Sequence, residues 1–200
     1  MKNIKWKSLI VTSVFCLLPV LLGVVMWENL PERVAIHFDF NSNPDGFASK
    51  EFAVFAMPVI MALLQAFLCV VTDINALKHG EKKFDRAMKW IIPVMTVVLH
   101  VVMLGYALGW VVDIRKTAAL VVAVLFIVIG SFLPELDYIK NYKLPKEKAL
   151  KINRFVGCIT VVLGILFAIS IFLPPVATMA CILLIIPYTV VTIVYFFKNK

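Results

Sequence analysis

The chain has 200 residues, of which 62% are hydrophobic and 16% charged, and its formal net charge is +8. Because a soluble domain is usually about 45–50% apolar and about 25% charged, this composition excludes an ordinary water-soluble globular protein. The basic residues lie in short segments between apolar runs, a pattern that favours membrane orientation over direct nucleic-acid binding.

Six apolar runs follow one another along the chain. They cover residues 8–27, 52–72, 90–112, 118–136, 155–173 and 176–197. Each is about 17–23 residues long, which is enough for a helix to cross a hydrocarbon core of roughly 30 Å. None alternates polar and apolar residues as a barrel strand does. We therefore predict an all-α, polytopic protein of the lipid bilayer, with one membrane domain over residues 1–200 and a first helix that is retained rather than cleaved.

The distribution of lysine and arginine predicts the orientation of the helices. Sixteen of these residues fall in the N-terminal tail, in the segments 78–89 and 140–154, and in the C-terminal tail. The remaining four are Arg33, Lys50, Arg115 and Lys116. By the positive-inside rule, both termini are expected in the cytoplasm, and the segment 28–51 is expected outside.

The outer segment 28–51 carries the clearest local pattern. Val34 to Phe40 alternates between apolar and mostly polar residues, which predicts a short amphipathic strand. Residues 41–46 then carry a strong turn signal, because Pro44 fixes φ and Gly46 permits a positive φ. We expect an ordered loop that rests its apolar face on helix ends or on the lipid surface.

His37, Asp39 and Asp45 form the main polar cluster of this loop. One interpretation is a recognition site for a peptide or a lipid headgroup. Another is a loop held by its own hydrogen bonds, in which His37 or Asp45 caps backbone N–H groups. A metal site is the third, but the spacing is loose and no Cys or HExxH motif accompanies these residues, so no metal site is predicted.

Polar residues inside the apolar runs form a second group of candidates. His100 lies in the middle of the third run and is the ionisable residue that we expect inside the bilayer, where such residues are functional candidates. The structural alternative is a hydrogen bond to a neighbouring helix, through Gln65, Thr96 or Thr160. No carboxylate is expected at the depth of His100, so a proton relay there would lack a second proton-binding residue.

Four prolines, Pro19, Pro58, Pro93 and Pro187, interrupt apolar runs and are expected to kink helices. Such kinks can create a cavity or a gate, as in transporters, but proline is also common in membrane helices without such a role. The four cysteines lie singly within apolar runs and are interpreted as small core residues. No nucleophile, phosphate-binding, dinucleotide-binding or zinc motif is present, so we predict neither an enzyme nor a cofactor.

The segment 140–154 is the longer of the two basic loops expected in the cytoplasm. Pro145 is placed to open a short helix there. We choose this loop as a surface for a cytoplasmic partner, although orientation alone also explains its charge. Its candidate residues are Lys140, Asn141, Lys143, Pro145, Asn153 and Arg154.

Residues of the outer loop resemble the N-terminal module of the SdpI-type bacterial membrane proteins. That module reads LP, a few residues, H-[FW]-N, then G-x-P-D-G-aromatic and S-K, just after the first helix. The matching residues here are Leu30, Pro31, His37, Phe38, Asn41, Pro44, Asp45, Gly46, Phe47, Ser49 and Lys50. The glycine that usually precedes Pro-Asp-Gly is missing, and Ser42 and Asn43 stand in that neighbourhood.

Residues 118–197 resemble the second SdpI module, with departures. The matching positions include Gly130, Pro134, Asn141, Pro145, Arg154 and Gly157. Ser131 replaces the usual asparagine, Asn153 replaces a histidine, and no Trp-Thr pair follows Pro145. These departures fall at the cytoplasmic positions of the module, so the resemblance is weaker there than in the outer loop.

The resemblance implies a protein of the bacterial cytoplasmic membrane that confers immunity to a secreted, membrane-active antimicrobial peptide. It also implies that the protein could signal, by drawing a transcriptional repressor to the membrane. The residues expected to recognise the peptide are His37, Phe38, Asn41, Pro44, Asp45, Gly46, Phe47 and Lys50. The alternative from a different class is a small transporter or lipid-handling protein that uses His100 and the kinked helices.

Overall fold

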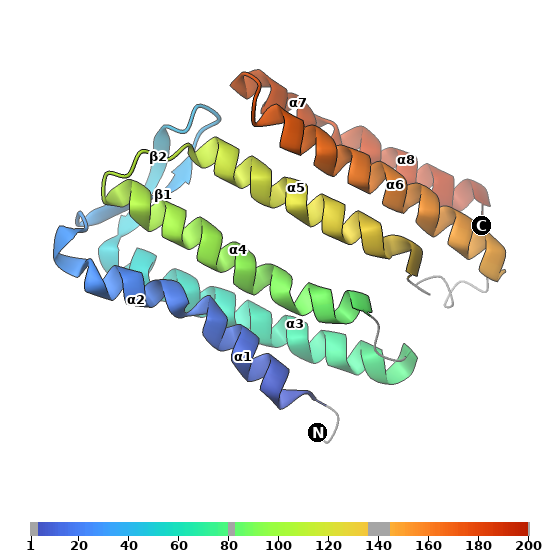
Figure 1. Ribbon diagram of the computed structural model, residues 1–200, viewed down its shortest axis with the longest axis horizontal. Helices are drawn as coiled ribbons and strands as arrows, with labels where there is room; N and C mark the ends of the chain where they lie inside the picture. The colour runs from blue at the N-terminus through green and yellow to red at the C-terminus, as the bar shows by residue number, and fades with distance from the viewer. Residues whose placement is uncertain (1–3, 80–82, 136–144, 200) are drawn as a thin grey trace. The chain divides into compact units, whose positions relative to one another are not determined.

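A computed structural model describes residues 4–79, 83–135 and 145–199 of the chain (Figure 1). Within these residues, six helical segments are long and apolar enough to cross a membrane. They are Trp6–Val25, Phe52–Leu77, Lys83–Ala107, Ile114–Phe132, Glu147–Ser170 and Pro175–Lys198. The prediction of an all-α, polytopic membrane protein is therefore confirmed. The chain divides into two compact units, Met1–Thr117 and Ala118–Lys200, which we call unit 1 and unit 2.

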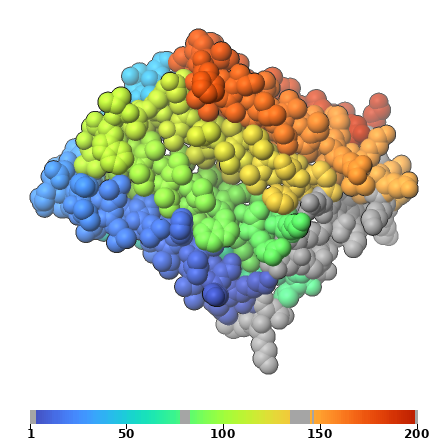
Figure 2. All heavy atoms as spheres, in the orientation of Figure 1, coloured from blue at the N-terminus to red at the C-terminus, as the bar shows by residue number. Residues whose placement is uncertain are grey.

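Unit 1 contains three membrane-length helical segments and a small β-hairpin. Its elements are α1 (Trp6–Cys16), α2 (Leu18–Val25), η1 (Trp27–Asn29), β1 (Arg33–Phe38), β2 (Pro44–Ser49), η2 (Phe52–Ala56), α3 (Met57–His79), α4 (Lys83–Ala107) and the first turn of α5 (Ile114–Phe132). Helices α1, α3 and α4 pack against one another, and α2 packs on α4. In Figure 2 the side chains of α1, α2 and α4 meet without a visible gap.

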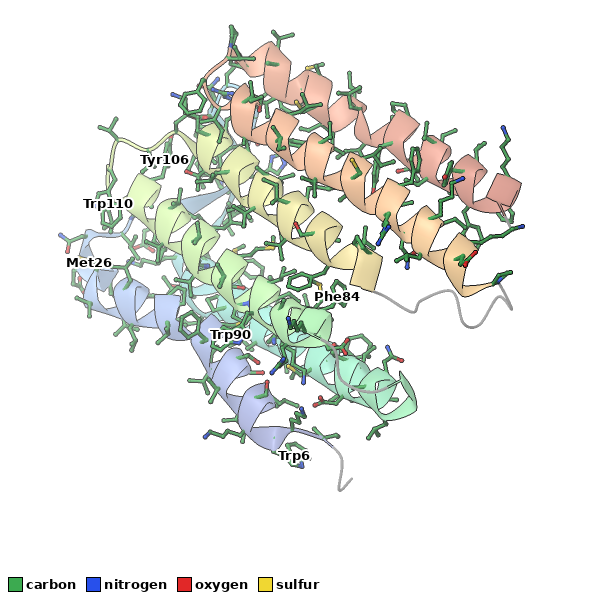
Figure 3. All side chains as sticks on the ribbon, turned by 45° about the vertical axis from the view of Figure 1, so that its right-hand side comes forward. Trp6, Met26, Phe84, Trp90, Tyr106 and Trp110 are labelled. Carbon is green, nitrogen blue, oxygen red and sulfur yellow. The ribbon has the colours of Figure 1, made fainter. Side chains whose placement is uncertain are left out.

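The two ends of unit 1 differ in structure. The hairpin, η1 and the last turns of α4 lie at one end, which we call the hairpin end (Figure 1). The beginning of α1 and of α4 lie at the opposite end, which we call the Lys5 end. Figure 3 shows the same separation along α4, where Trp90 lies towards the Lys5 end and Tyr106 towards the hairpin end.

Helix interruptions occur just before three of the four intramembrane prolines. Leu17 separates α1 from α2 two residues before Pro19, and Leu184 separates α7 from α8 three residues before Pro187. A π-helix, η2, precedes Pro58. A proline has no N–H and its ring collides with the carbonyl four residues earlier, so the helix breaks there. Pro93 differs, since α4 continues through it.

The segment between the first two spans folds as a two-stranded antiparallel hairpin rather than as one strand and a return. Arg33 pairs with Ser49 and His37 with Gly46, and the register is irregular on both sides of His37. Strand β2 is not predicted from the sequence, because Pro44 and Gly46 are typical of turns. The predicted alternation is also imperfect, since Val34 and Ala35 are both buried.

An apolar cluster fills the space beneath the hairpin. It consists of Leu30, Val34, Ala53, Val54, Met103 and Leu104. Ala53 and Val54 come from η2, and Met103 and Leu104 come from the end of α4, so the hairpin, η2 and α4 share one core. Burial of this apolar surface holds the hairpin on the helix ends.

Unit 2 contains the rest of α5, η3 (Leu133–Glu135), α6 (Lys146–Ser170), α7 (Pro175–Leu183) and α8 (Ile185–Asn199). Helices α5 and α6 approach closely where Gly130 lies against Gly157, because a Cβ at either position would come within 3 Å of the other residue's carbonyl oxygen. Small residues at a helix interface permit this approach in membranes. The core of unit 2 includes Phe167, whose ring stacks on that of Phe126.

Candidate functional site

The turn of the hairpin is built around the carboxylate of Asp39. Its Oδ1 accepts hydrogen bonds from the backbone N–H groups of Asn41 and Asn43, each at 2.8 Å, and its Oδ2 accepts one from the Asn43 side chain. The bonds of Asn43 and Asn41 outweigh desolvation and lower the pKa of Asp39 below its ordinary value of 3.8. The turn is thus held by its own hydrogen bonds, and Asp39 makes them rather than His37 or Asp45.

Ser42 occupies the strained position of the turn. Its φ is 66°, a left-handed value that a residue with a side chain adopts only rarely. The Ser42 hydroxyl lies 3.2 Å from Asp113 Oδ1 and accepts a hydrogen bond from the backbone N–H of Arg115. The residue that stands near the missing glycine therefore takes a glycine-like conformation and ties the turn to the beginning of α5.

Gly46 has a different role from the one predicted. Its φ is not positive, since Ser42 and Gly109 are the residues with positive φ in the described part of the chain. A Cβ at Gly46 would lie 2.8 Å from the Cβ of His37 on the paired strand. Gly46 is therefore required by the close approach of His37 and not by turn geometry.

The exposed face of the hairpin carries two adjacent polar pairs. His37 Nδ1 lies 2.5 Å from Asp45 Oδ1, and the two side chains are 73% and 49% exposed. The guanidinium of Arg33 lies over the ring of Phe47, 5.9 Å from its centroid. These four side chains, which we call the hairpin face, present a hydrogen-bonded histidine–aspartate pair and a cation–π pair to solvent.

Two of the residues predicted to recognise a peptide lie on the inner side of the hairpin. Phe38 packs edge-on against Tyr106 of α4, with 4.9 Å between ring centroids. Lys50 is 7% exposed, its Nζ lies 3.1 Å from Glu32 Oε1, and its ammonium lies over the ring of Trp27. These contacts attach the hairpin to the helices, so Phe38 and Lys50 position the hairpin face without belonging to it.

Inside unit 1, Gln65 compensates for a proline. Pro93 cannot donate the helical hydrogen bond that the carbonyl of Lys89 should accept. Gln65 Nε2 donates to that carbonyl at 2.7 Å, and it also lies 2.9 Å from Thr12 Oγ1 and 3.1 Å from Cys69 Sγ. A polar side chain from a neighbouring helix thus satisfies the backbone group that proline leaves free, which explains how α4 continues through Pro93.

His100 plays the same part for Pro58. In the π-helix η2 the N–H of Met57 bonds the carbonyl of Phe52, five residues earlier. The next bond in this register joins Ala53 to Pro58, which has no N–H. The backbone of Ala53 bonds His100 instead. Because Nε2 of His100 has no partner among the described residues, this bond uses Nδ1. The predicted partners Gln65, Thr96 and Thr160 bond other groups.

A buried ion pair that was not predicted from the sequence lies inside unit 1. Lys89 Nζ lies 2.5 Å from Asp73 Oδ1, and both side chains are 3% exposed. The backbone N–H of Lys5 donates to Asp73 Oδ2 at 3.0 Å. Asp73 and Lys89 are therefore ionisable side chains buried in unit 1 in addition to His100. Two features of the sequence point to this pair. Asp73 directly follows an apolar run, and Lys89 lies four residues before Pro93.

The predicted cytoplasmic surface is described only in part. Lys140, Asn141 and Lys143 lie outside the described residues. Pro145 precedes the membrane-length helix α6, so it does not open a separate short helix. Asn153 is 8% exposed, whereas Arg154 is exposed.

Residues 14–62 match the model of a family described as a domain of unknown function, DUF1648. No curated protein and no solved structure matches the chain. The matched segment runs from the end of α1 through α2 and the hairpin into the first turns of α3. The chain is thus similar to this family over the hairpin and the helices that flank it.

Proposed function

We propose that the chain is an SdpI-like immunity protein of the bacterial cytoplasmic membrane, and that the hairpin face binds a secreted, membrane-active peptide. The observation that carries this proposal is a solvent-exposed set of polar and aromatic side chains on a hairpin attached at both ends. Ser42 attaches the turn to Asp113, and Lys50 attaches the base to Glu32 and Trp27. A preorganised surface loses little conformational freedom when it binds a partner.

The composition of the hairpin face suits an amphipathic peptide. Phe47 offers an aromatic surface that is 47% exposed, and Arg33, His37 and Asp45 offer charged or hydrogen-bonding groups beside it. Aromatic and arginine side chains carry much of the binding energy at protein interfaces. Signalling through a cytoplasmic repressor is a further part of this proposal, and the segment around Pro145 and Arg154 is its candidate surface.

The survival of cells exposed to the toxic peptide tests the binding surface. Cells producing the His37→Ala/Asp45→Ala double variant should lose protection against the cognate peptide at equal membrane abundance, because the double variant removes the central pair of the face. The matched control is Glu28→Ala/Asn29→Ala, which alters two exposed residues of η1 at the same end of unit 1. Full protection by the His37/Asp45 variant would refute binding at the hairpin face.

The polar interior of unit 1 supports a second candidate, a small transporter. Gln65, Asp73, Lys89 and His100 are all buried there, and polar residues within spans commonly line substrate or ion pathways. Retained peptide protection together with the loss of a transport activity in Asp73→Asn would favour this candidate over immunity.

A further inference from the structure

Three buried polar atoms in unit 1 have no partner among the described residues, namely Ser13 Oγ, Gln65 Oε1 and His100 Nε2. Gln65 Oε1 and His100 Nε2 are acceptors on side chains that are 0% and 5% exposed. In both side chains the nitrogen that donates is already used, by the carbonyl of Lys89 and by that of Ala53. The remaining atoms are lone-pair acceptors in a buried setting, and such atoms are commonly satisfied by internal water.

Polar side chains of α1, α3 and α4 line the interior of unit 1 from Gln65 and His100 to the Lys5 end. The buried side of α4 carries Lys89, Thr96 and His100. Opposite it, α3 contributes Asp73, Cys69 and Gln65, and α1 contributes Thr12 and Cys16. Contacts link these groups across the helices. Thr12 lies 3.4 Å from Cys69 Sγ, Cys16 bonds Thr96, and Asp73 bonds Lys89. We call this set of side chains the polar ladder.

The polar ladder ends at His100 on the side of the hairpin. The next buried residues of α4 are Met103 and Leu104, which belong to the apolar cluster beneath the hairpin with Leu30, Val34 and Val54. At the opposite end, Asp73 accepts the N–H of Lys5, and Lys5 is exposed. Polar groups therefore reach His100 from the Lys5 end, and apolar side chains separate it from the hairpin end.

We propose that internal water occupies the polar ladder and that His100 Nε2 takes up a proton from the Lys5 end only. The proton comes from bulk water at that end, passes along bound water and ladder hydroxyl groups, and bonds to the Nε2 lone pair. The Nδ1 proton stays on Nδ1, in its hydrogen bond to the Ala53 carbonyl, so the ring becomes an imidazolium and no bond of the chain breaks.

Among the described side chains, few titratable or charged groups lie in the interior of unit 1 on α4 or on the elements packed against it. They are Cys16 of α1, Cys69 and Asp73 of α3, and Lys89 of α4 itself, while α2 contributes none. Arg33 and His37 of β1 are exposed on the hairpin. Since Asp73 is paired with Lys89, no carboxylate adjoins the ring, and proton uptake depends on the hydrated path. This inference goes beyond peptide binding and does not rest on it.

The test uses the full chain in sealed vesicles, with ¹⁵N-labelled histidine and the substitutions His37→Gln and His79→Gln, so that His100 gives the remaining ring signals. Each side of the vesicle is acidified in turn, and the Nε2 signal is followed by solid-state NMR. Acidification at the Lys5 end should move the signal to the imidazolium position, and acidification at the hairpin end should leave it unchanged.

Two variants identify the route. Thr96→Val removes a ladder hydroxyl with little change in shape and should suppress the response, whereas Thr96→Ser keeps the hydroxyl and should preserve it. Thr160→Val, a buried threonine of unit 2, is the control and should have no effect. The proposal is overturned if His100 responds to neither side, if it responds equally to both, or if Thr96→Val responds like the parent.

Discussion

At the scale of single residues, unit 1 pairs each of two intramembrane prolines with a polar side chain on another helix. Pro93 leaves the carbonyl of Lys89 without a helical N–H donor, and Gln65 donates to it instead. Pro58 leaves the carbonyl of Ala53 without a donor, and His100 donates to it. In lipid no water is available for a freed carbonyl, so the neighbouring helix has to supply the donor. This pairing gives both polar residues a structural reason for being inside the membrane.

The pairing of Gln65 with Pro93 predicts a coupled mutational effect. Gln65→Leu should destabilise the folded chain by about 1–3 kcal/mol, because it leaves a buried carbonyl without a donor. Pro93→Ala restores an N–H to α4, so the double variant should be clearly more stable than Gln65→Leu alone. Reversible unfolding of all four proteins in the same detergent measures this cycle. Simple additivity of the two single effects would contradict the pairing.

At the scale of elements, the hairpin depends on Ser42 for its turn and for its attachment to α5. Ser42→Ala keeps the unfavourable positive φ and removes the hydroxyl that contacts Asp113 and Arg115. Ser42→Gly also removes the hydroxyl but relieves the backbone strain. We therefore expect protease cleavage of the hairpin to increase most in Ser42→Ala and less in Ser42→Gly. Equal cleavage of the two variants would show that the strain is unimportant.

The hairpin should also loosen in acid. The pKa of Asp39 is lowered by the N–H groups of Asn43 and Asn41. The pKa of Asp113 is likewise lowered. Desolvation raises it, but the bonds from Lys116 and Ser42 outweigh that effect. Both folded pKa values lie below the ordinary 3.8, so the stabilisation is complete above that value and is lost as the pH falls through the lowered values.

NMR signals of residues 39–46, recorded as the pH is lowered below 3.8, measure this loosening. Asp39→Asn/Asp113→Asn keeps an oxygen acceptor at each position but cannot be protonated, so its hairpin signals should stay nearly constant over the same range. Hairpin signals that titrate identically in the parent and the double variant would assign the acid response to other groups.

The elements differ in how well the sequence predicts them. The six spans are evident from apolar length alone, because lipid demands a minimum run of helix. Strand β2 is not, since Pro44 and Gly46 act through contacts with the paired strand that a local pattern does not contain. The ion pair of Asp73 with Lys89 is hidden for a related reason, as each residue lies at the edge of its run and reads as a charge that sets orientation.

The candidate site shows the same division between local pattern and tertiary contact. The turn and the exposure of His37 and Asp45 follow from local polarity. The inward positions of Phe38 and Lys50 depend on Tyr106 and on Trp27, which lie elsewhere in the sequence. The alternation that placed Phe38 on the apolar side was informative, whereas nothing local indicated that a lysine would be buried.

At the scale of the whole molecule, the charges predict which end of unit 1 faces the cytoplasm. Of the four basic residues assigned to the outer side, Lys50 is 7% exposed and the Arg115 side chain is 8% exposed. Only Arg33 and Lys116 of this group present their charge openly. Among the described side chains, the exposed basic residues assigned to the cytoplasmic side are Lys5, Lys7, Lys83, Arg86, Lys148, Lys151, Arg154 and Lys198, so the exposed positive charge keeps the one-sided distribution of the sequence count of sixteen against four.

Cysteine labelling in intact cells tests this orientation. In a background in which the four native cysteines are replaced, Asn41→Cys at the hairpin tip should react with a membrane-impermeant thiol reagent added outside. Lys83→Cys, at the exposed beginning of α4, should react only after the cells are permeabilised. Equal reaction of both variants with a permeant reagent is the control for access. Labelling of Lys83→Cys but not Asn41→Cys in intact cells would reverse the topology, and it would place the hairpin face where no secreted peptide could reach it.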